Sequence, residues 1–200
     1  MKKDLTTIDS LSKLFDAQME TLKARGYSQI IIDVFISKRS EVLLKASKIE
    51  VTDGHILFIP VIPRTEVDFD NLMKTVRNHG REGYNHLSQS AVSNVVDVPK
   101  GLYFMFDVED GKDMLGKSPE KAQALIKEQK RSCLTVEEVI ALCVHKNVLS
   151  EHNVDCTGSR YRQNGKVPNV YLLGDGPELG SGDIDSSNDE WGSASCRERS

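Results

Sequence analysis

Apolar side chains recur every three or four positions in the first part of the chain, which is the spacing of an amphipathic helix. Over residues 6–25 this pattern predicts one helix, and Gly26 ends it because glycine readily adopts the backbone conformation that follows a helix. Residues 28–47 predict a second helix, although the opening I-I-I-D-V-F-I is also typical of a strand. The chain therefore begins with a helical layer.

Continuous apolar runs further along the chain predict strands. Residues 55–63 (H-I-L-F-I-P-V-I-P) follow the Asp53-Gly54 turn and end in proline, which is typical of a buried strand. Two further candidates are residues 91–98 and 101–111. The second is apolar enough to lie in the centre of a sheet.

Three later helices have recognisable N-terminal residues. The first runs from Thr65, its predicted N-cap, to His79. Ser118 begins the second, and the proline that follows is suited to the first position of a helix. The third begins at Thr135, where Glu138 completes a capping box.

The last part of the chain contains the clearest turn. Residues 154–162 and 166–173 flank Gln163-Asn164-Gly165, and this predicts a β-hairpin. Pro168 places the second strand at a sheet edge or at a bulge. From Gly174 onward small and polar residues dominate, so an irregular segment is expected. The elements together predict an α+β fold: a helical N-terminal layer packed on a mixed β-sheet, with a C-terminal hairpin and a docked irregular closing segment.

Composition narrows the class of protein. The chain has 200 residues, of which 38% are hydrophobic and only 6% aromatic, so we expect one domain with an aliphatic core. We assign this domain to residues 1–195 and a flexible C-terminus to residues 196–200. The net charge of −4 argues against a nucleic-acid-binding protein, which would carry a basic face. No apolar run approaches the ~20 residues of a membrane helix, and no secretory signal is seen, so we expect a cytoplasmic protein without a membrane contact.

Cysteine and histidine side chains raise the question of a metal. Cys143, His145, His152 and Cys156 are of the types that bind zinc. Cys143 and His145 lie two positions apart on a predicted helix and so face different ways, and the turns of a zinc knuckle are missing. We therefore predict no metal. Motifs for a catalytic nucleophile or a phosphate-binding loop are also missing, so no cofactor is predicted.

Arg160 stands within the first strand of the predicted hairpin, after Gly158 and Ser159. An arginine there must extend to solvent, pair with a carboxylate or hold an anionic ligand. A structural pair with a carboxylate of the acidic closing segment is the favoured interpretation, and an anion clamp is the second.

Several stretches occur in a recognisable order: T-V-E-E-V-I-A-L, L-S-E-H-N-V-D-C-T-G-S-R, K-V-P-N-V-Y-L, G-P-E-L-G and W-G-S-A-S. With L-F-D-A-Q-M-E-T-L-K-A-R-G-Y near the N-terminus, this order resembles an uncharacterised bacterial family, domain-of-unknown-function family 5701. The resemblance implies no activity. It implies that the end of the chain belongs to the domain, with Trp191 as a buried anchor. Between Gly180 and Trp191 the family tends to be aromatic, whereas this chain reads S-G-D-I-D-S-S-N-D-E.

The sequence predicts a non-catalytic protein that binds a small ligand or a protein partner. Two alternatives stay open. The first is a hydrolase or transferase, with its site between the hairpin and the C-terminal loop and an anion held by Arg160; the second is an assembly or scaffold protein. A deep polar pocket around Arg160 would favour the enzyme, and a flat apolar patch would favour partner binding. The candidate ligand-binding residues are Ser159, Arg160, Trp191, Ser193 and Ser195.

Overall fold

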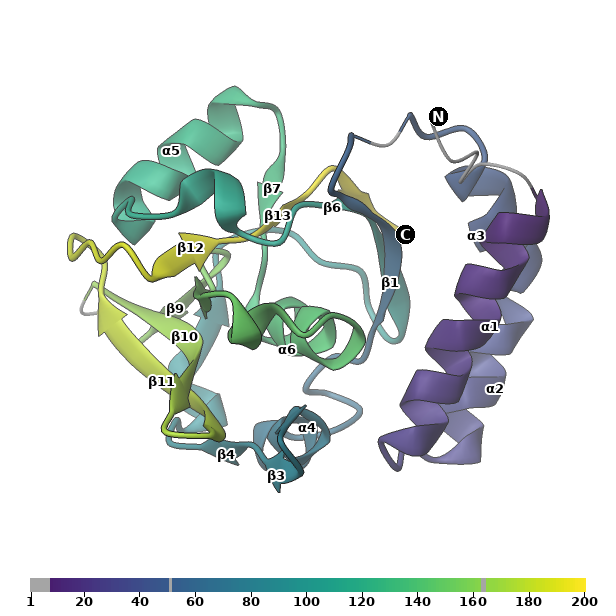
Figure 1. Cartoon of the computed structure of the whole chain (residues 1–200), viewed down its shortest axis with the longest axis horizontal. Helices are drawn as coiled ribbons and strands as arrows, with labels where there is room; N and C mark the ends of the chain where they lie inside the picture. Colours follow the sequence, from purple (N-terminus) through teal and green to yellow (C-terminus); the bar gives the residue numbers. More distant parts are fainter. Residues whose placement is uncertain (1–7, 51, 163–164) are drawn as a thin grey trace.

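The N-terminal part of the chain is helical, as the apolar spacing predicts. The computed structural model describes residues 8–50, 52–162 and 165–200. Its first helices are α1 (Ile8–Ala24), α2 (Gln29–Ser37) and α3 (Arg39–Ala46), which lie together on one side of the molecule (Figure 1). The helix predicted over residues 28–47 is thus present as two helices that meet at Lys38.

These helices cover a three-stranded antiparallel sheet. Its strands, in spatial order, are β1 (Ile56–Val61), β6 (Tyr103–Val108) and β14 (Glu198–Arg199). The ring of Phe15 in α1 stacks on that of Phe104 in β6, with 5.9 Å between the centroids. All six residues of β6 are buried, which indicates that both faces of this strand are covered.

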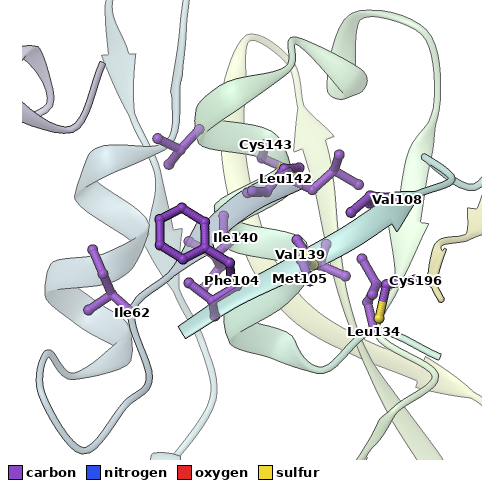
Figure 2. Packing of buried hydrophobic residues seen from close by; sticks show 14 of the residues in the cluster. Ile62, Phe104, Met105, Val108, Leu134, Val139, Ile140, Leu142, Cys143 and Cys196 are labelled. Atoms are coloured by element: carbon purple, nitrogen blue, oxygen red, sulfur yellow. The ribbon is translucent and has the colours of Figure 1, made fainter. Parts of the chain in front are cut away.

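Helix α6 (Val136–His145) lies between this sheet and a second sheet. It contacts β1 on one side and β10 (Lys166–Leu173) on the other. Every residue from Val136 to Val144 is buried, as expected for a helix enclosed on all sides. Figure 2 shows Val139 and Ile140 of this helix close to Met105 and Phe104 of β6. The predicted capping box of Thr135 and Glu138 is confirmed.

The second sheet is mixed and has β10 near its centre. Its path runs β12 (Trp191–Ser193), β8 (Asn153–Asp155), β10, β11 (Gly176–Asp183) and β4 (Tyr84–Asn85), with β9 (Ser159–Tyr161) and β5 (Val92–Asn94) attached beside β10. The pairs β12–β8 and β11–β4 are parallel, and the others are antiparallel. The fold is therefore α+β, as predicted. The N-terminal helices, however, pack on the antiparallel sheet, and α6 separates them from the mixed one.

Shorter elements complete the fold. They are α4 (Phe69–Thr75), α5 (Pro119–Glu128), the 3-10 turns η1 (Gln89–Ala91), η2 (Lys112–Met114) and η3 (Val148–Ser150), and the strands β2 (Arg77–Asn78), β3 (Arg81–Glu82), β7 (Ser132–Cys133) and β13 (Ser195–Cys196). Helix α5 begins after Ser118 as predicted. Among the helices of the described ranges, none is long and apolar enough to cross a membrane.

Helix α4 is shorter than the sequence predicts. Its N-cap is Asp68, whose side chain accepts a hydrogen bond of 2.8 Å from the Asn71 amide, and not Thr65. The residues before it form a turn in which the Glu66 amide donates to the Pro63 carbonyl. The helix ends at Thr75 because Val76 is extended and leads into β2.

The last part of the chain differs most from expectation. The predicted hairpin is confirmed by the antiparallel pair Tyr161 and Lys166, while its turn residues 163–164 lie outside the described ranges. Pro168 does not lie on an edge strand, because β10 pairs on both sides; it faces the break between β8 and β9.

The segment after Gly174 is irregular only over residues 184–190, because all eight residues of β11 pair with β10. Residues 196–200 are not a flexible end. The thiol-bearing Cys196 is fully buried in β13, and β14 pairs with β6. The closing segment therefore contributes strands to three sheets, namely β12, β13 and β14.

Candidate functional site

Ser159 and Arg160, two of the predicted ligand-binding residues, lie in β9 and have packing roles. The buried Ser159 hydroxyl accepts a hydrogen bond of 3.2 Å from the Val136 amide and donates one of 3.1 Å to Asn94. Since Val136 is the first residue of α6, Ser159 satisfies a backbone amide that the helix itself leaves free. This serine therefore holds the start of the helix.

Arg160 does not pair with a carboxylate, so the favoured interpretation of this residue is wrong. Its guanidinium donates to the carbonyls of Thr157 (3.0 Å) and Ser159 (2.8 Å), and to the side-chain oxygen of Gln123 (2.7 Å). Gln123 belongs to α5, the element that faces Arg160, and it offers a neutral amide. Within the described ranges no ion pair includes this arginine.

The two other predicted serines are buried in different sheets. Ser195 in β13 accepts a hydrogen bond of 2.8 Å from Nε of Arg131. Ser193 in β12 is fully buried, and its hydroxyl has no described hydrogen-bond partner. Its partner across the ladder is Asp155 of β8. The five predicted residues thus do not converge on one site.

Trp191 docks on the mixed sheet, as the resemblance implies, but it is only half-buried. Its backbone pairs with Asn153, and its ring lies 5.8 Å from that of Tyr171 between centroids, at an interplanar angle of 39°. The expectation of a fully buried anchor is therefore corrected. One part of the indole packs against the sheet, and the residue also lines a cleft.

This cleft, here called the Trp191 cleft, has a volume of about 210 Å³. It lies between β8, β10, the end of β11 and the loop that returns to β12, with the start of α5 beside it. Its lining residues are Pro119, Asp155, Asn169, Gly182, Asp183, Ser186, Ser187, Asn188 and Trp191.

Asp155 and Asn169 are the buried polar residues of the cleft. They are direct partners across the β8–β10 ladder, and they are 5% and 6% exposed. Burial raises the pKa of Asp155 to about 7, while a side-chain hydrogen bond with Asn169 opposes this rise. The side-chain oxygen of Asn169 has no described partner. The pair therefore combines a carboxyl group that titrates near neutral pH with a free hydrogen-bond acceptor.

The charge of the cleft favours particular ligands. Its described lining residues include Asp155 and Asp183 but no lysine or arginine, although Lys166 lies 3.1 Å from the Asp183 carboxylate. Further acidic residues follow in the same loop, namely Asp185, Asp189 and Glu190. The cleft thus repels anions and admits neutral or cationic groups.

At one wall of the cleft, Gly182 leaves room that a side chain would fill. A Cβ atom placed on Gly182 would lie 3.2 Å from the side-chain nitrogen of Asn169, closer than most Cβ contacts. Any larger residue would push against the amide that forms the polar part of the cleft.

Sequence reasoning identified Trp191 but missed Asp155 and Asn169. A signal was present, because each is a polar residue inside a short apolar strand, V-D-C and V-P-N-V. Buried polar residues in such strands require a partner or a ligand. The register that pairs these two residues is not visible in the sequence.

The four possible zinc ligands have other surroundings. His152 is buried, and its Nε2 lies 3.1 Å from the Asp110 carbonyl, whereas Nε2 of His145 has no described partner. Burial lowers the pKa of His145 to about 3. Cys143 and Cys156 are free and buried. In the part of the chain that the structure describes, no group of three or more His, Cys, Asp or Glu is placed to hold a metal ion.

Comparisons with known proteins give a family but no activity. No curated protein matches the chain significantly. No solved structure matches it either. Residues 21–200 match the model of the family of unknown function DUF5701, so the end of the chain, including β12 to β14, lies within the matched region. The chain therefore belongs to this family of unknown function, DUF5701.

Proposed function

We propose that this protein binds a small neutral ligand in the Trp191 cleft without transforming it. The unpartnered side-chain oxygen of Asn169, beside the titrating carboxyl group of Asp155, carries the proposal. A buried acceptor without a donor costs about 1–3 kcal/mol, and a ligand that supplies an N–H or O–H group would recover that free energy.

The dimensions of the cleft limit the ligand. Its volume of about 210 Å³ is below the roughly 300–1,000 Å³ of pockets that hold drug-sized molecules. The half-buried indole of Trp191 offers a flat apolar face, and the serines and Asn188 of the loop offer further polar groups. These features suit a single ring with hydroxyl or amide groups at its edge, the size of a monosaccharide or a nucleobase.

The enzyme alternative receives less support. Arg160, proposed to hold an anion, is not among the residues that line the cleft, and the acidic lining disfavours anions. Among the lining residues that the structure describes, there is also no histidine, lysine or cysteine to activate a nucleophile. A bacterial, cytoplasmic setting remains part of the proposal.

The fluorescence of Trp191 tests the proposal, since this is the only tryptophan of the chain. The protein is titrated with a panel of neutral monosaccharides, nucleobases and nucleosides. We expect one class to change the emission saturably. Asn169→Leu, which keeps the side-chain size, should weaken that binding at least about tenfold, the loss expected when one buried hydrogen bond is removed. Asn147→Leu, at an exposed position outside the cleft, is the matched control.

Two other outcomes would contradict ligand binding in the Trp191 cleft. If no member of the panel changes the emission, and Asn169→Leu raises the melting temperature, the amide is a structural cost and the cleft is not a ligand site. Equal binding by the Asn169 and Asn147 variants would place the ligand elsewhere on the molecule.

Protein binding is the second candidate, favoured by an apolar surface on α2. Ile30, Val34 and Ile36 are 78%, 39% and 47% exposed, although they belong to a helix whose other face packs in the core. Sedimentation at increasing protein concentration tests this surface for self-association. A mass above that of one chain, restored to one chain by Ile30→Ser, would support it.

A further inference from the structure

A second cleft lies apart from the Trp191 cleft and has the opposite charge. It has a volume of about 490 Å³ and is here called the Asp107 cleft. Its lining residues are Thr52, His55, Asp113, Gln129, Lys130, Arg131 and Arg197, none of which lines the Trp191 cleft.

Asp107 lies beneath this cleft in an unusual backbone conformation. Its side chain is fully buried in β6, and its φ angle of 49° is in the left-handed region. Lys130, on the wall of the cleft, has a φ of 56°. Non-glycine residues adopt such angles at a cost, and the surrounding contacts must hold them there. Both deviations therefore occur around one cleft.

The Asp107 carboxylate holds three basic side chains. Oδ1 lies 2.7 Å from Nδ1 of His55, while Oδ2 accepts from Nη1 of Arg131 at 2.8 Å and lies 2.9 Å from Nε of Arg197. Burial alone would raise the pKa of Asp107, but the hydrogen bonds from Arg131 and His55 lower it. The carboxylate thus stays charged and fixes these side chains at the cleft.

The basic groups keep donors that Asp107 does not use. Arg197 is 46% exposed in its side chain and pairs through Nε, which leaves both terminal nitrogens without a described partner. The exposed Lys130 ammonium also lacks a described partner. Two arginines and one lysine face the carboxylates of Asp107 and Asp113, so one positive charge remains even when His55 is neutral.

We propose that the Asp107 cleft is an oxyanion site for the phosphate or carboxylate group of a small metabolite. The terminal nitrogens of Arg197 supply a planar pair of donors, and Lys130 adds a point charge. Asp113, exposed in the lining, disfavours a chain of phosphates. A single anionic group is therefore the fitting ligand.

The test measures binding of inorganic phosphate by calorimetry at constant ionic strength, with chloride as the replaced anion and acetate as a separate arm. We expect phosphate to bind saturably in the full chain. Lys130→Gln should weaken it at least fivefold, because the variant removes one positive charge from the lining of the cleft. The contacts of Asp107 should stay intact, since the Lys130 ammonium makes none of them. Asp113→Asn should strengthen it at least twofold. Acetate binding with the same dependence would assign the site to carboxylates.

The control variant is Lys74→Gln, which removes one exposed charge on α4, away from the lining of the cleft. Phosphate binding that is absent, or that changes equally in the Lys130, Asp113 and Lys74 variants, would overturn the proposal and leave Asp107 as a structural charge centre. Asn169→Leu should leave phosphate binding unchanged, so this result is independent of the Trp191 cleft.

Discussion

At the scale of the residue, the buried carboxyl groups fall into two kinds. Glu138 is fully buried but receives hydrogen bonds from Arg199, the Tyr103 hydroxyl and the Thr135 amide. Asp155 is almost as buried, yet its hydrogen-bonding neighbour is the neutral amide of Asn169. A positive charge compensates Glu138, whereas none in the described ranges compensates Asp155. Removing the Arg199 charge should therefore destabilise the protein, and neutralising Asp155 should stabilise it.

Asp155→Asn should stabilise the protein at alkaline pH. The pKa of Asp155 is about 7 in the folded protein and roughly 4 in an unfolded chain. Stability that is fully present below pH 4 is therefore lost as the pH rises through 7, by up to roughly 4 kcal/mol. Urea unfolding should show the variant ~2–4 kcal/mol more stable than the native protein at pH 8 and little changed at pH 4. Parallel pH profiles for the two proteins would show that Asp155 is not destabilised by ionisation.

Arg199→Ala should destabilise the protein strongly. The guanidinium lies 2.6 Å and 2.9 Å from the two oxygens of Glu138, and it also donates to Ser132 and to the Cys133 carbonyl. Removing one partner of a buried pair costs ~3–5 kcal/mol. The neighbouring Glu198, 43% exposed and 3.2 Å from Lys45, supplies the control: Glu198→Ala should cost ~0–1 kcal/mol. Equal shifts in melting temperature for both would contradict the buried pair.

At the scale of the element, two glycines allow one backbone segment to pack directly on another. A Cβ atom at Gly158 would lie 2.7 Å from the Cys133 carbonyl oxygen and 2.8 Å from that of Leu134. At Gly192 it would collide with the Gly111 carbonyl. In both places strand backbone packs directly on another backbone segment. The glycines of the G-S-R and W-G-S stretches therefore allow these strands to contact neighbouring backbone.

Alanine at either glycine should lower stability. Neither clash can be relieved by rotating a side chain, so Gly158→Ala and Gly192→Ala should each cost at least ~1–3 kcal/mol in thermal unfolding. Gly176→Ala is the matched change, since its added methyl group would meet nothing closer than 3.7 Å. Melting temperatures that agree among the three variants would refute the close approach.

The sequence predicted the elements whose causes are local. Helix α6 has its capping box and α5 its serine and proline within a few residues. Strand β11 was missed because G-P-E-L-G-S-G-D has little intrinsic strand preference. It forms because β10 supplies a full ladder of hydrogen bonds.

The candidate site was harder to predict because its residues come together only through contacts between distant segments. Trp191 was found because a lone tryptophan is conspicuous in the sequence. Asp155 and Asn169 become a pair only through the β8–β10 register. Similarly, Asp107 and Arg197 meet because β13 and β14 return along β6. Contacts between distant segments leave no periodic pattern for a sequence to reveal.

At the scale of the whole molecule, the closing segment connects the layers. β12 extends the mixed sheet, β13 pairs with β7, and β14 extends the antiparallel sheet beneath the N-terminal helices (Figure 1). The main core cluster draws on residues from Leu11 to Cys196. The layers on either side of α6 therefore share one segment.

Deletion of residues 197–200 should disturb the molecule far from the deletion. It removes β14 and the partner of Glu138, although none of these residues lines the Trp191 cleft. If the layers unfold together, the emission of Trp191 should shift to longer wavelength at temperatures where the native protein is folded. A lower melting temperature with unchanged Trp191 emission before unfolding would show that the mixed sheet is stable independently.

The position of β14 has a consequence for biosynthesis. Strand β6 is paired with β1 on one side, but its other edge receives β14 only after most of the chain has been made. Until then the nascent protein exposes an edge with the sequence Y-F-M-F, and an open apolar edge can pair with another molecule. Chains delayed at this stage are therefore expected to aggregate through this strand edge.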